Sequence, residues 1–149
     1  MSEHVATARR IIDANRYLTL ATADADGRPW ATPVWFAPEG YTEFIWVSRP
    51  STRHSINIAV RPEVGIVVFD STVPIGQGQA VYIEAVAEQL PEAGIDAALE
   101  VYSGRSEANG GRSWGRNDVL GTSAFRLYRA RAAAQYVLDE HDGRVRVAP

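Results

Sequence analysis

The amino-acid sequence predicts an α+β fold, with one small, mainly antiparallel β-barrel of about seven strands and short helices beside it. The length of 149 residues suits one domain with a substantial core, and no repeat or linker divides the chain. Seven segments have the alternating or mostly apolar pattern of strands, separated by turn residues. Three short segments have apolar residues at helical spacing. This combination is typical of a single barrel domain, here over residues 1–149.

The first half of the chain is predicted to form a helix followed by an antiparallel hairpin. Apolar residues recur at helical spacing through residues 3–15. Asp26-Gly27 is a strong hairpin signal because it lies between two strand-like patterns. The mostly apolar run at 64–71 is typical of a buried central strand. The strands expected over the whole chain are 17–22, 28–37, 41–48, 64–71, 78–90, 119–131 and 133–147.

The second half combines one helix, a polar segment and the last strands. A helix is expected over 91–102, where a proline at the first position precedes apolar residues at helical spacing. Residues 103–118 are rich in glycine and polar side chains, and we expect a loop there. Trp114 in this segment either contacts a partner or covers part of the core. Asp142-Gly143 marks a turn inside the last strand segment.

Composition and charge exclude several classes of function. The net charge of −3 argues against a general binder of nucleic acid or anionic membranes. Cysteine is absent, which removes disulfides, thiol nucleophiles and thiolate metal sites, and lysine is absent as well. The histidines lack metal-ligand spacing, so no metal site is expected. No segment has the length of a transmembrane helix or the apolar core of a signal peptide, so we expect a cytoplasmic protein.

The segment SRPSTRHSINIAVRP, residues 48–62, holds the most informative pattern in the chain. Its alternating apolar residues fit a strand. However, residues 49–63 separate two predicted strands, and an interval of this length favours a helix that stops before Arg61-Pro62. Ser51 or Thr52 would cap the first turn of this helix.

Three basic residues lie near the predicted N-terminus of this helix, where positive charge is unfavourable. Arg49, Arg53 and His54 gather near the predicted N-terminus, which the helix dipole already makes positive. A bound phosphate would make this placement favourable, because free N–H groups, hydroxyls and cations all donate to an anion. Surface arginines are also commonplace. The residues alone therefore leave a bound phosphate and a solvated surface as alternatives.

Two prolines interrupt the second predicted strand, PWATPVWFA at residues 29–37. Pro29 and Pro33 argue against a central, fully paired strand. The gap in the ladder lets a ligand meet free backbone groups; the alternative is an edge strand whose aromatic residues pack in the core. Gln79, before a later strand, is placed to face a cofactor, although a surface glutamine is the ordinary interpretation.

Three segments, taken in order, resemble the pyridoxamine 5′-phosphate oxidase-like, FMN-binding split-barrel family. They match its first hairpin, its phosphate-binding strand–helix–strand segment and the long strand that follows, over about residues 10–90. The resemblance implies a split β-barrel that binds FMN as one domain. It also implies a homodimer in which each flavin lies at the interface and touches both chains. The segments are LATADADGRPWATPVWF, FIWVSRPSTRHSINIAVRPEVGIVVFD and GQAVYIEAVAEQL.

The resemblance also implies roles for single residues. The second strand would run along the flavin ring, mainly with backbone contacts. Arg53 matches the phosphate-binding arginine of the family, and His54 occupies a position where lysine is frequent. On the substrate side, the partner would contribute Arg126 and Tyr136. The implied cofactor-binding residues are Trp30, Ala31, Thr32, Pro33, Val34, Val47, Ser48, Arg53, His54 and Gln79.

The implied function is an FMN-dependent oxidoreductase that acts on a small organic substrate by hydride transfer at the flavin. No catalytic residue is assigned, because no acid–base pair or triad stands out in the chain. The ending HDGRVRVAP lacks the substrate-binding segment of the oxidase, which argues against pyridoxamine phosphate as the substrate. Two alternatives stay open: a deazaflavin-dependent reductase, and a flavin carrier or redox sensor without turnover.

Overall fold

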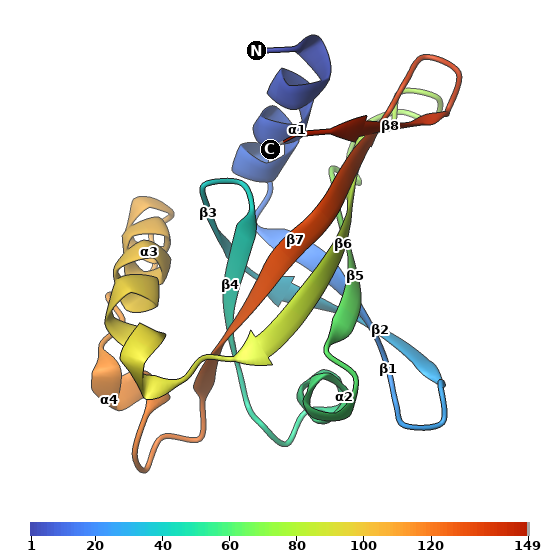
Figure 1. Cartoon of the computed structure of the whole chain (residues 1–149). Coiled ribbons are helices and arrows are strands. Elements are labelled where there is room, and N and C mark those ends of the chain that lie inside the picture. The colour runs from blue at the N-terminus through green and yellow to red at the C-terminus, as the bar shows by residue number, and fades with distance from the viewer. Residues whose placement is uncertain (149) are drawn as a thin grey trace.

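The computed structural model describes residues 1–148, and its strands form one antiparallel sheet that curls into a half-barrel (Figure 1). The strand order is β2-β1-β5-β6-β7-β4-β3, and β8 pairs with β7. The predicted α+β, mainly antiparallel fold is confirmed, with eight strands instead of about seven. The strands are β1 (Tyr17–Ala23), β2 (Pro29–Trp35), β3 (Ala37–Glu39), β4 (Glu43–Ser48), β5 (Glu63–Phe69), β6 (Ala80–Gln89), β7 (Arg126–Leu138) and β8 (Arg144–Val147).

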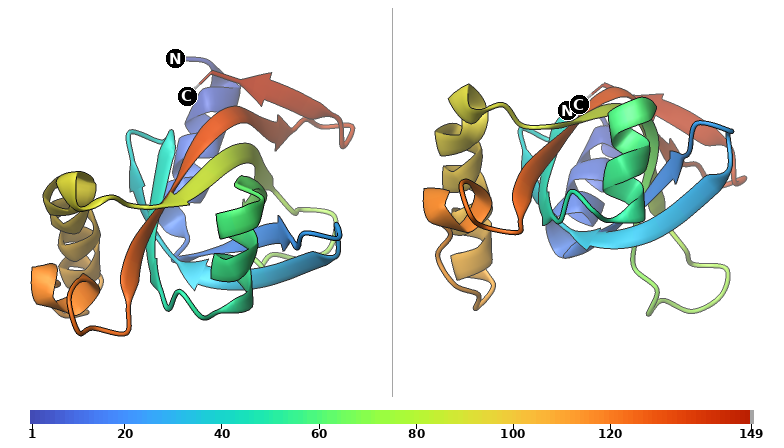
Figure 2. Two further views of the ribbon diagram at one scale, coloured as in Figure 1. Left: turned by 60° about the horizontal axis from the view of Figure 1, so that its bottom comes forward. Right: turned by 90° about the horizontal axis from the view of Figure 1, so that it is seen from below.

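The helices cover the ends and one side of the curled sheet (Figure 2). Helix α1 packs on β5 to β8, whereas α2 lies across the opposite opening against β1, β2 and β6. Helices α3 and α4 stand outside the barrel, beside β3, β4 and β7. None of the helices within residues 1–148 is long and apolar enough to span a membrane. The helical elements are α1 (Glu3–Ala14), α2 (Arg53–Val60), the 3-10 turn η1 (Glu92–Gly94), α3 (Ile95–Ala108) and α4 (Arg116–Val119).

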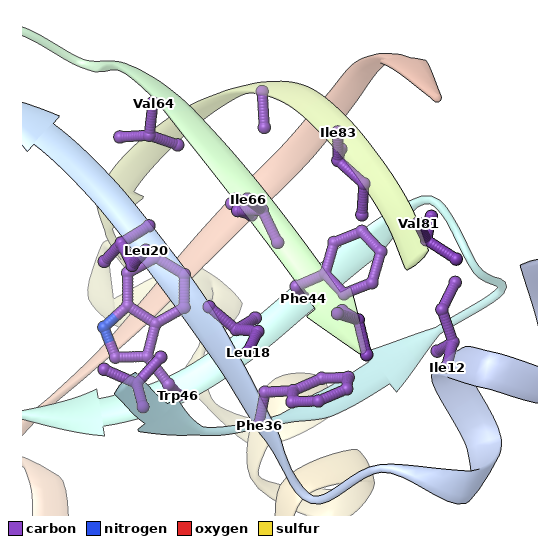
Figure 3. Close-up of a cluster of buried hydrophobic side chains, with 14 of the residues drawn as sticks. Ile12, Leu18, Leu20, Phe36, Phe44, Trp46, Val64, Ile66, Val81 and Ile83 are labelled. Carbon is purple, nitrogen blue, oxygen red and sulfur yellow. The ribbon is translucent and has the colours of Figure 1, made fainter. Parts of the chain in front are cut away.

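The main core fills the inside of the curled sheet (Figure 3). Leu18 and Leu20 of β1 point inward because alternate residues of a strand face the same side. They meet Phe44 and Trp46 of β4, which are also fully buried. Ile12 of α1 closes one end of this core. Alternation in the sequence thus fixes which face of each strand is apolar, and the curl of the sheet brings those faces together.

The expected loop over 103–118 is wrong, because α3 continues to Ala108 and α4 occupies part of the remainder. Polar groups of this segment form hydrogen bonds with one another. Ser103 Oγ accepts the Trp114 N–H at 2.9 Å, and Ser106 Oγ donates to the Arg112 carbonyl at 2.8 Å. Serines on the buried face of a helix thus replace the apolar residues that would have indicated its continuation.

The predicted division between strands 119–131 and 133–147 is also wrong. β7 runs without a break through this boundary, while the segment before it holds α4 and turns. Ala85 of β6 pairs with Ala132 and Glu84 pairs with Ala134, so Ala133 is left over as a bulge. The bulge lies in a run of alanines at 132–134, which lacks the alternation of a strand, so the sequence alone suggested that one strand ended here. The turn at Asp142-Gly143 is confirmed, and it joins β7 to β8.

Candidate functional site

Helix α2 begins at Arg53, at the cation-rich stretch found in the sequence. Thr52 is its N-cap, and its side chain accepts the Ser55 N–H at 3.4 Å. The helix is therefore confirmed, with Thr52 rather than Ser51 as the capping residue. Its side chains at 54, 55, 57 and 58 are buried, which is the one-sided pattern of a helix on a sheet rather than the alternation of a strand. The N-terminus of α2 faces the end of β4 and the β1–β2 hairpin.

His54 turns back from α2 toward the last residue of β4. Its Nε2 lies 2.8 Å from Ser48 Oγ and 3.3 Å from Thr52 Oγ1. Ser48 and His54 are both buried, at 7% and 8% exposure. Burial lowers the pKa of His54 below its ordinary value, because a charged ring loses hydration there. The structure thus brings together two of the predicted phosphate-site residues, and burial favours the neutral form of the histidine.

Arg53 points the other way, toward the second strand. Its guanidinium carbon lies 4.3 Å from the centre of the Trp30 ring, a cation–π contact. Arg49 makes a similar contact at 4.8 Å with Phe125. Neither arginine belongs to an ion pair within residues 1–148. Two guanidinium groups thus lie at the start of α2 without an ion-paired carboxylate in the described part of the chain.

The strand β2 is at one end of the strand order and pairs only with β1. This edge position explains why Pro29 and Pro33 are tolerated. Trp30 is 40% exposed, and Ala31 and Pro33 are exposed as well, whereas Val34 enters the core. The strand predicted to follow the flavin ring therefore presents a largely uncovered edge and outer face.

A buried polar contact that the sequence did not reveal fixes α2 against β1. Asn57 Nδ2 donates to Thr22 Oγ1 at 3.0 Å, and both residues are buried. Asn57 is three positions after His54, so the two side chains lie on the same side of the helix. This spacing in the sequence could have indicated that Asn57 belongs to the same buried side of the helix. Nothing in the sequence indicated its partner Thr22, which lies 35 residues earlier.

Gln79 does not join the other predicted site residues within one chain. It is exposed before β6, and its side chain accepts a hydrogen bond from Arg10 of α1. Tyr136 also lies away from α2, because it pairs with Tyr82 on β6. Arg126 lies opposite Ser48 in the β4–β7 ladder, close to the start of α2. Val47 is half-buried and pairs with Leu127.

The curled antiparallel sheet, with a helix across one opening, is that of a split-barrel protein. A family model described as pyridoxamine 5′-phosphate oxidase matches residues 5–137. The chain therefore belongs to the pyridoxamine 5′-phosphate oxidase family, and the resemblance seen in the sequence is confirmed. Comparison with curated protein sequences gives no significant match.

Solved structures with the same fold include proteins named for different functions. A heme binding protein from Mycobacterium smegmatis is 19% identical with a TM-score of 0.75, and the match covers 99% of this chain and 59% of that one. The heme storage protein HutZ from Vibrio cholerae is 21% identical, with a TM-score of 0.64 and coverages of 83% and 86%. A Clostridium acetobutylicum protein related to general stress protein 26, of the pyridoxinephosphate oxidase family, is 11% identical, with a TM-score of 0.68 and coverages of 96% and 92%. At these identities the likeness establishes the fold.

Proposed function

We propose that the chain binds FMN and acts as a flavin-dependent oxidoreductase on a small organic molecule. The observation that carries this proposal is Arg53. It stands at the N-terminus of α2 over the Trp30 ring and has no carboxylate partner within residues 1–148. An unpaired guanidinium beside free helix N–H groups favours a phosphate. Membership of the family supports FMN as the source of that phosphate.

The groups around the helix start fit a phosphate monoester. The backbone N–H groups of Arg53 and His54 have no acceptor within residues 1–148, as expected for the first residues of a helix. The hydroxyls of Ser48 and Thr52 lie beside them, at the His54 ring. The two N–H groups and the Ser48 hydroxyl can donate to a phosphate oxygen, whereas the Thr52 hydroxyl already donates to the Arg49 carbonyl at 2.9 Å. In this proposal Arg53 supplies the fixed charge.

The edge strand β2 suits the flat ring of a flavin. Between Trp30 and Val34 the strand pairs on one side only, so backbone groups on its other side are free. Pro33 removes one N–H from that edge. In this proposal Trp30, Ala31, Thr32, Pro33 and Val34 hold the ring, and Val47 lies near the ribityl chain. The bound flavin supplies hydride transfer at its N5, and the chain positions it.

A homodimer would complete the site. The outer face of β1, β2 and β5 carries the small residues Ala21, Ala31 and Gly65 side by side. Tyr17 and Phe69 on the same face are 59% and 48% exposed. An exposed apolar face of this kind is typical of an interface between subunits. Gln79 and Tyr136, which lie far from Arg53 within one chain, would then reach the flavin of the partner.

Measurements of cofactor content and of turnover on the purified protein test the proposal. The visible spectrum, with identification of any molecule released on denaturation, shows which cofactor the protein carries. We expect FMN, bound as isolated or taken up on titration. Reduction of this FMN by a nicotinamide cofactor and reoxidation by a substrate would establish turnover; binding without these reactions indicates a carrier or sensor. Uptake of a deazaflavin in place of FMN would indicate a deazaflavin-dependent reductase instead. A protein that takes up neither cofactor contradicts it.

Heme is a second candidate ligand, because similar structures are named for heme binding or heme storage. This chain spans only 59% of the length of the M. smegmatis protein, so the whole of that protein's function does not transfer directly. Heme iron needs an axial ligand such as histidine. His54 is buried against Ser48, which leaves His4 and His141 as the accessible histidines. A heme titration, followed at the intense absorption band of heme, would show whether the protein binds heme. The variants His4→Ala and His141→Ala would show which accessible histidine ligates the iron.

A further inference from the structure

Within residues 1–148, the side-chain contacts of His54 Nε2 are with hydroxyl groups, and this determines how the ring can respond to a ligand. Its Nε2 contacts Ser48 Oγ at 2.8 Å and Thr52 Oγ1 at 3.3 Å. A hydroxyl can donate to a bare ring nitrogen or accept from a protonated one, because its hydrogen rotates. The buried contact with Ser48 therefore accommodates both the neutral ring and the charged ring. The Thr52 hydroxyl, which donates to the Arg49 carbonyl, can only accept from the ring. A lysine at this position would have only the charged form near pH 7.

The surroundings of His54 contain more cations than anions. The charged groups on the elements packed around it include Arg53 on α2, Arg49 in the preceding loop, Arg126 on β7, Asp24 in the β1–β2 turn and Glu88 on β6. Arg28 of the same turn, Arg61 at the end of α2 and Glu84 of β6 belong to these elements as well. None of these carboxylates forms an ion pair with His54; the one histidine ion pair within residues 1–148 joins His141 to Glu140. Asp24 instead accepts backbone N–H groups of its own turn, and Glu88 pairs with Arg129.

Without a ligand, a positive His54 is therefore unfavourable. Burial lowers the pKa of the ring, and the positive end of α2 also disfavours a charge at this position. A phosphate dianion at the helix start would reverse the balance, because an opposite charge at close range favours the protonated ring. Fixed cations such as Arg53 cannot change in this way.

We propose that His54, held against Ser48, takes up a proton from solvent when a phosphate dianion binds at the start of α2, and thereby selects FMN over riboflavin. The inference rests on the proposed FMN function. It makes the phosphate subsite proton-coupled: one phosphate and one proton bind together, and both leave together. Discrimination against the unphosphorylated flavin is then strong in mildly acidic solution and declines as the pH rises.

Affinities for FMN and riboflavin, measured from pH 6 to 8.5 in phosphate-free buffer, test this inference. The phosphate group of FMN has its own second pKa of about 6, and the variants His54→Lys and His54→Gln correct for it. In the native protein, the ratio of the riboflavin Kd to the FMN Kd should fall by up to about tenfold per pH unit above pH 7, until the bound histidine has lost its proton. In both variants this ratio should be level above pH 7.

A measurement on the unmodified sequence avoids any folding defect of the variants. The NMR signals of ring-labelled histidine report the pKa of each imidazole, and the chain has only three histidines. The His54 signal is assigned as the one absent from His54→Gln. Saturating FMN should move its titration midpoint upward, whereas riboflavin should not. The riboflavin complex is the control, because riboflavin makes the ring contacts of FMN and lacks its phosphate.

The outcomes separate this inference from the function on which it rests. If FMN binds but the His54 midpoint is the same with FMN and with riboflavin, proton coupling is wrong and FMN binding stands. Parallel pH profiles of the native protein and both variants would likewise contradict proton coupling alone. If neither flavin binds at any pH, the proposed function and this inference both fall.

Discussion

The guanidinium of Arg53 lies 4.3 Å from the centre of the Trp30 ring, so the first residue of α2 is joined to the second residue of β2. In the proposed site, this contact links the phosphate end of FMN to the strand that follows its ring. Arginine stacks well on indole because the guanidinium is planar and weakly hydrated. The contact orients the arginine before a ligand arrives, which reduces the ordering cost of binding.

Replacing Arg53 by alanine should weaken FMN binding by about 1.5–3 kcal/mol, which is roughly a 10- to 150-fold rise in Kd, because a charge-assisted contact is lost. Riboflavin affinity should not change, since riboflavin has no phosphate. Arg61→Ala is the matched control: it removes the same charge from the exposed C-terminal end of α2. Fluorescence titration of both variants checks this. Equal Kd values for FMN in the native protein and Arg53→Ala would show that the arginine faces solvent.

Trp30 should act on FMN partly through Arg53. A double-mutant cycle with Trp30→Leu, Arg53→Ala and the double variant should give a coupling free energy of about 0.5–1 kcal/mol, the size of an exposed cation–π contact. The measured quantity is again the Kd for FMN. A coupling near zero would mean that the two residues contact the cofactor independently, and that their contact with each other has no part in binding.

Much of the fold could be predicted because local rules govern it. Asp26-Gly27 determines the first hairpin, and strand alternation identifies the core residues of β1. The failures occur where tertiary contacts override local composition. In α3, Ser103 and Ser106 are buried and bonded to residues 112–114, so a helix persists where glycine and serine indicate a loop. In β7, the bulge at Ala133 imitates a strand end.

The sequence predicted which residues belong to the candidate site, but it did not predict which side chains contact one another there. The position of Arg53 and His54 at a helix start follows from the capping pattern at Thr52. The opposite directions of the two side chains depend on where β2 and β4 lie relative to α2, and spacing along the chain does not define this. For the same reason, the family pattern could not show that Gln79 lies apart from Arg53.

Two glycines near the end of α3 should respond oppositely to substitution by alanine. Gly104 lies inside α3, and a Cβ there meets nothing within 4 Å. Gly104→Ala should therefore stabilise the protein by about 0.5–1 kcal/mol. A Cβ on Gly111 would overlap Ser106 Oγ and lie 3.1 Å from the Ser106 carbonyl oxygen. Gly111→Ala should destabilise by about 1 kcal/mol or more, because it breaks the Ser106 bond to Arg112. Urea unfolding measures both; stabilisation by Gly111→Ala would contradict the described course of residues 109–115.

The Asn57–Thr22 bond should contribute to stability in a way that a double-mutant cycle reveals. Asn57→Leu leaves the buried Thr22 hydroxyl without its donor, and Thr22→Val leaves the Asn57 amide without its acceptor, so each should cost about 1–3 kcal/mol. The double variant should cost less than the sum, because neither polar group is then stranded. Chemical unfolding gives the free energies, and strictly additive losses would show that the two groups do not stabilise each other.

The stability of the cofactor-free protein should depend on the protonation of His54. Its pKa is lowered in the folded state by burial, so between the folded value and the unfolded value of about 6.5 the unfolded chain binds more protons. The free energy of unfolding therefore rises with pH through this range, and the stability is lost as the pH falls below about 6.5. Thermal unfolding in phosphate-free buffers from pH 8 to 5 measures this slope. His54→Asn should flatten it, whereas His141→Asn, at an exposed position, should keep it. Because acidic side chains titrate alike in all three proteins, the difference between the native and His54→Asn curves isolates the buried ring, and coincident curves would mean that His54 is already hydrated in the folded protein.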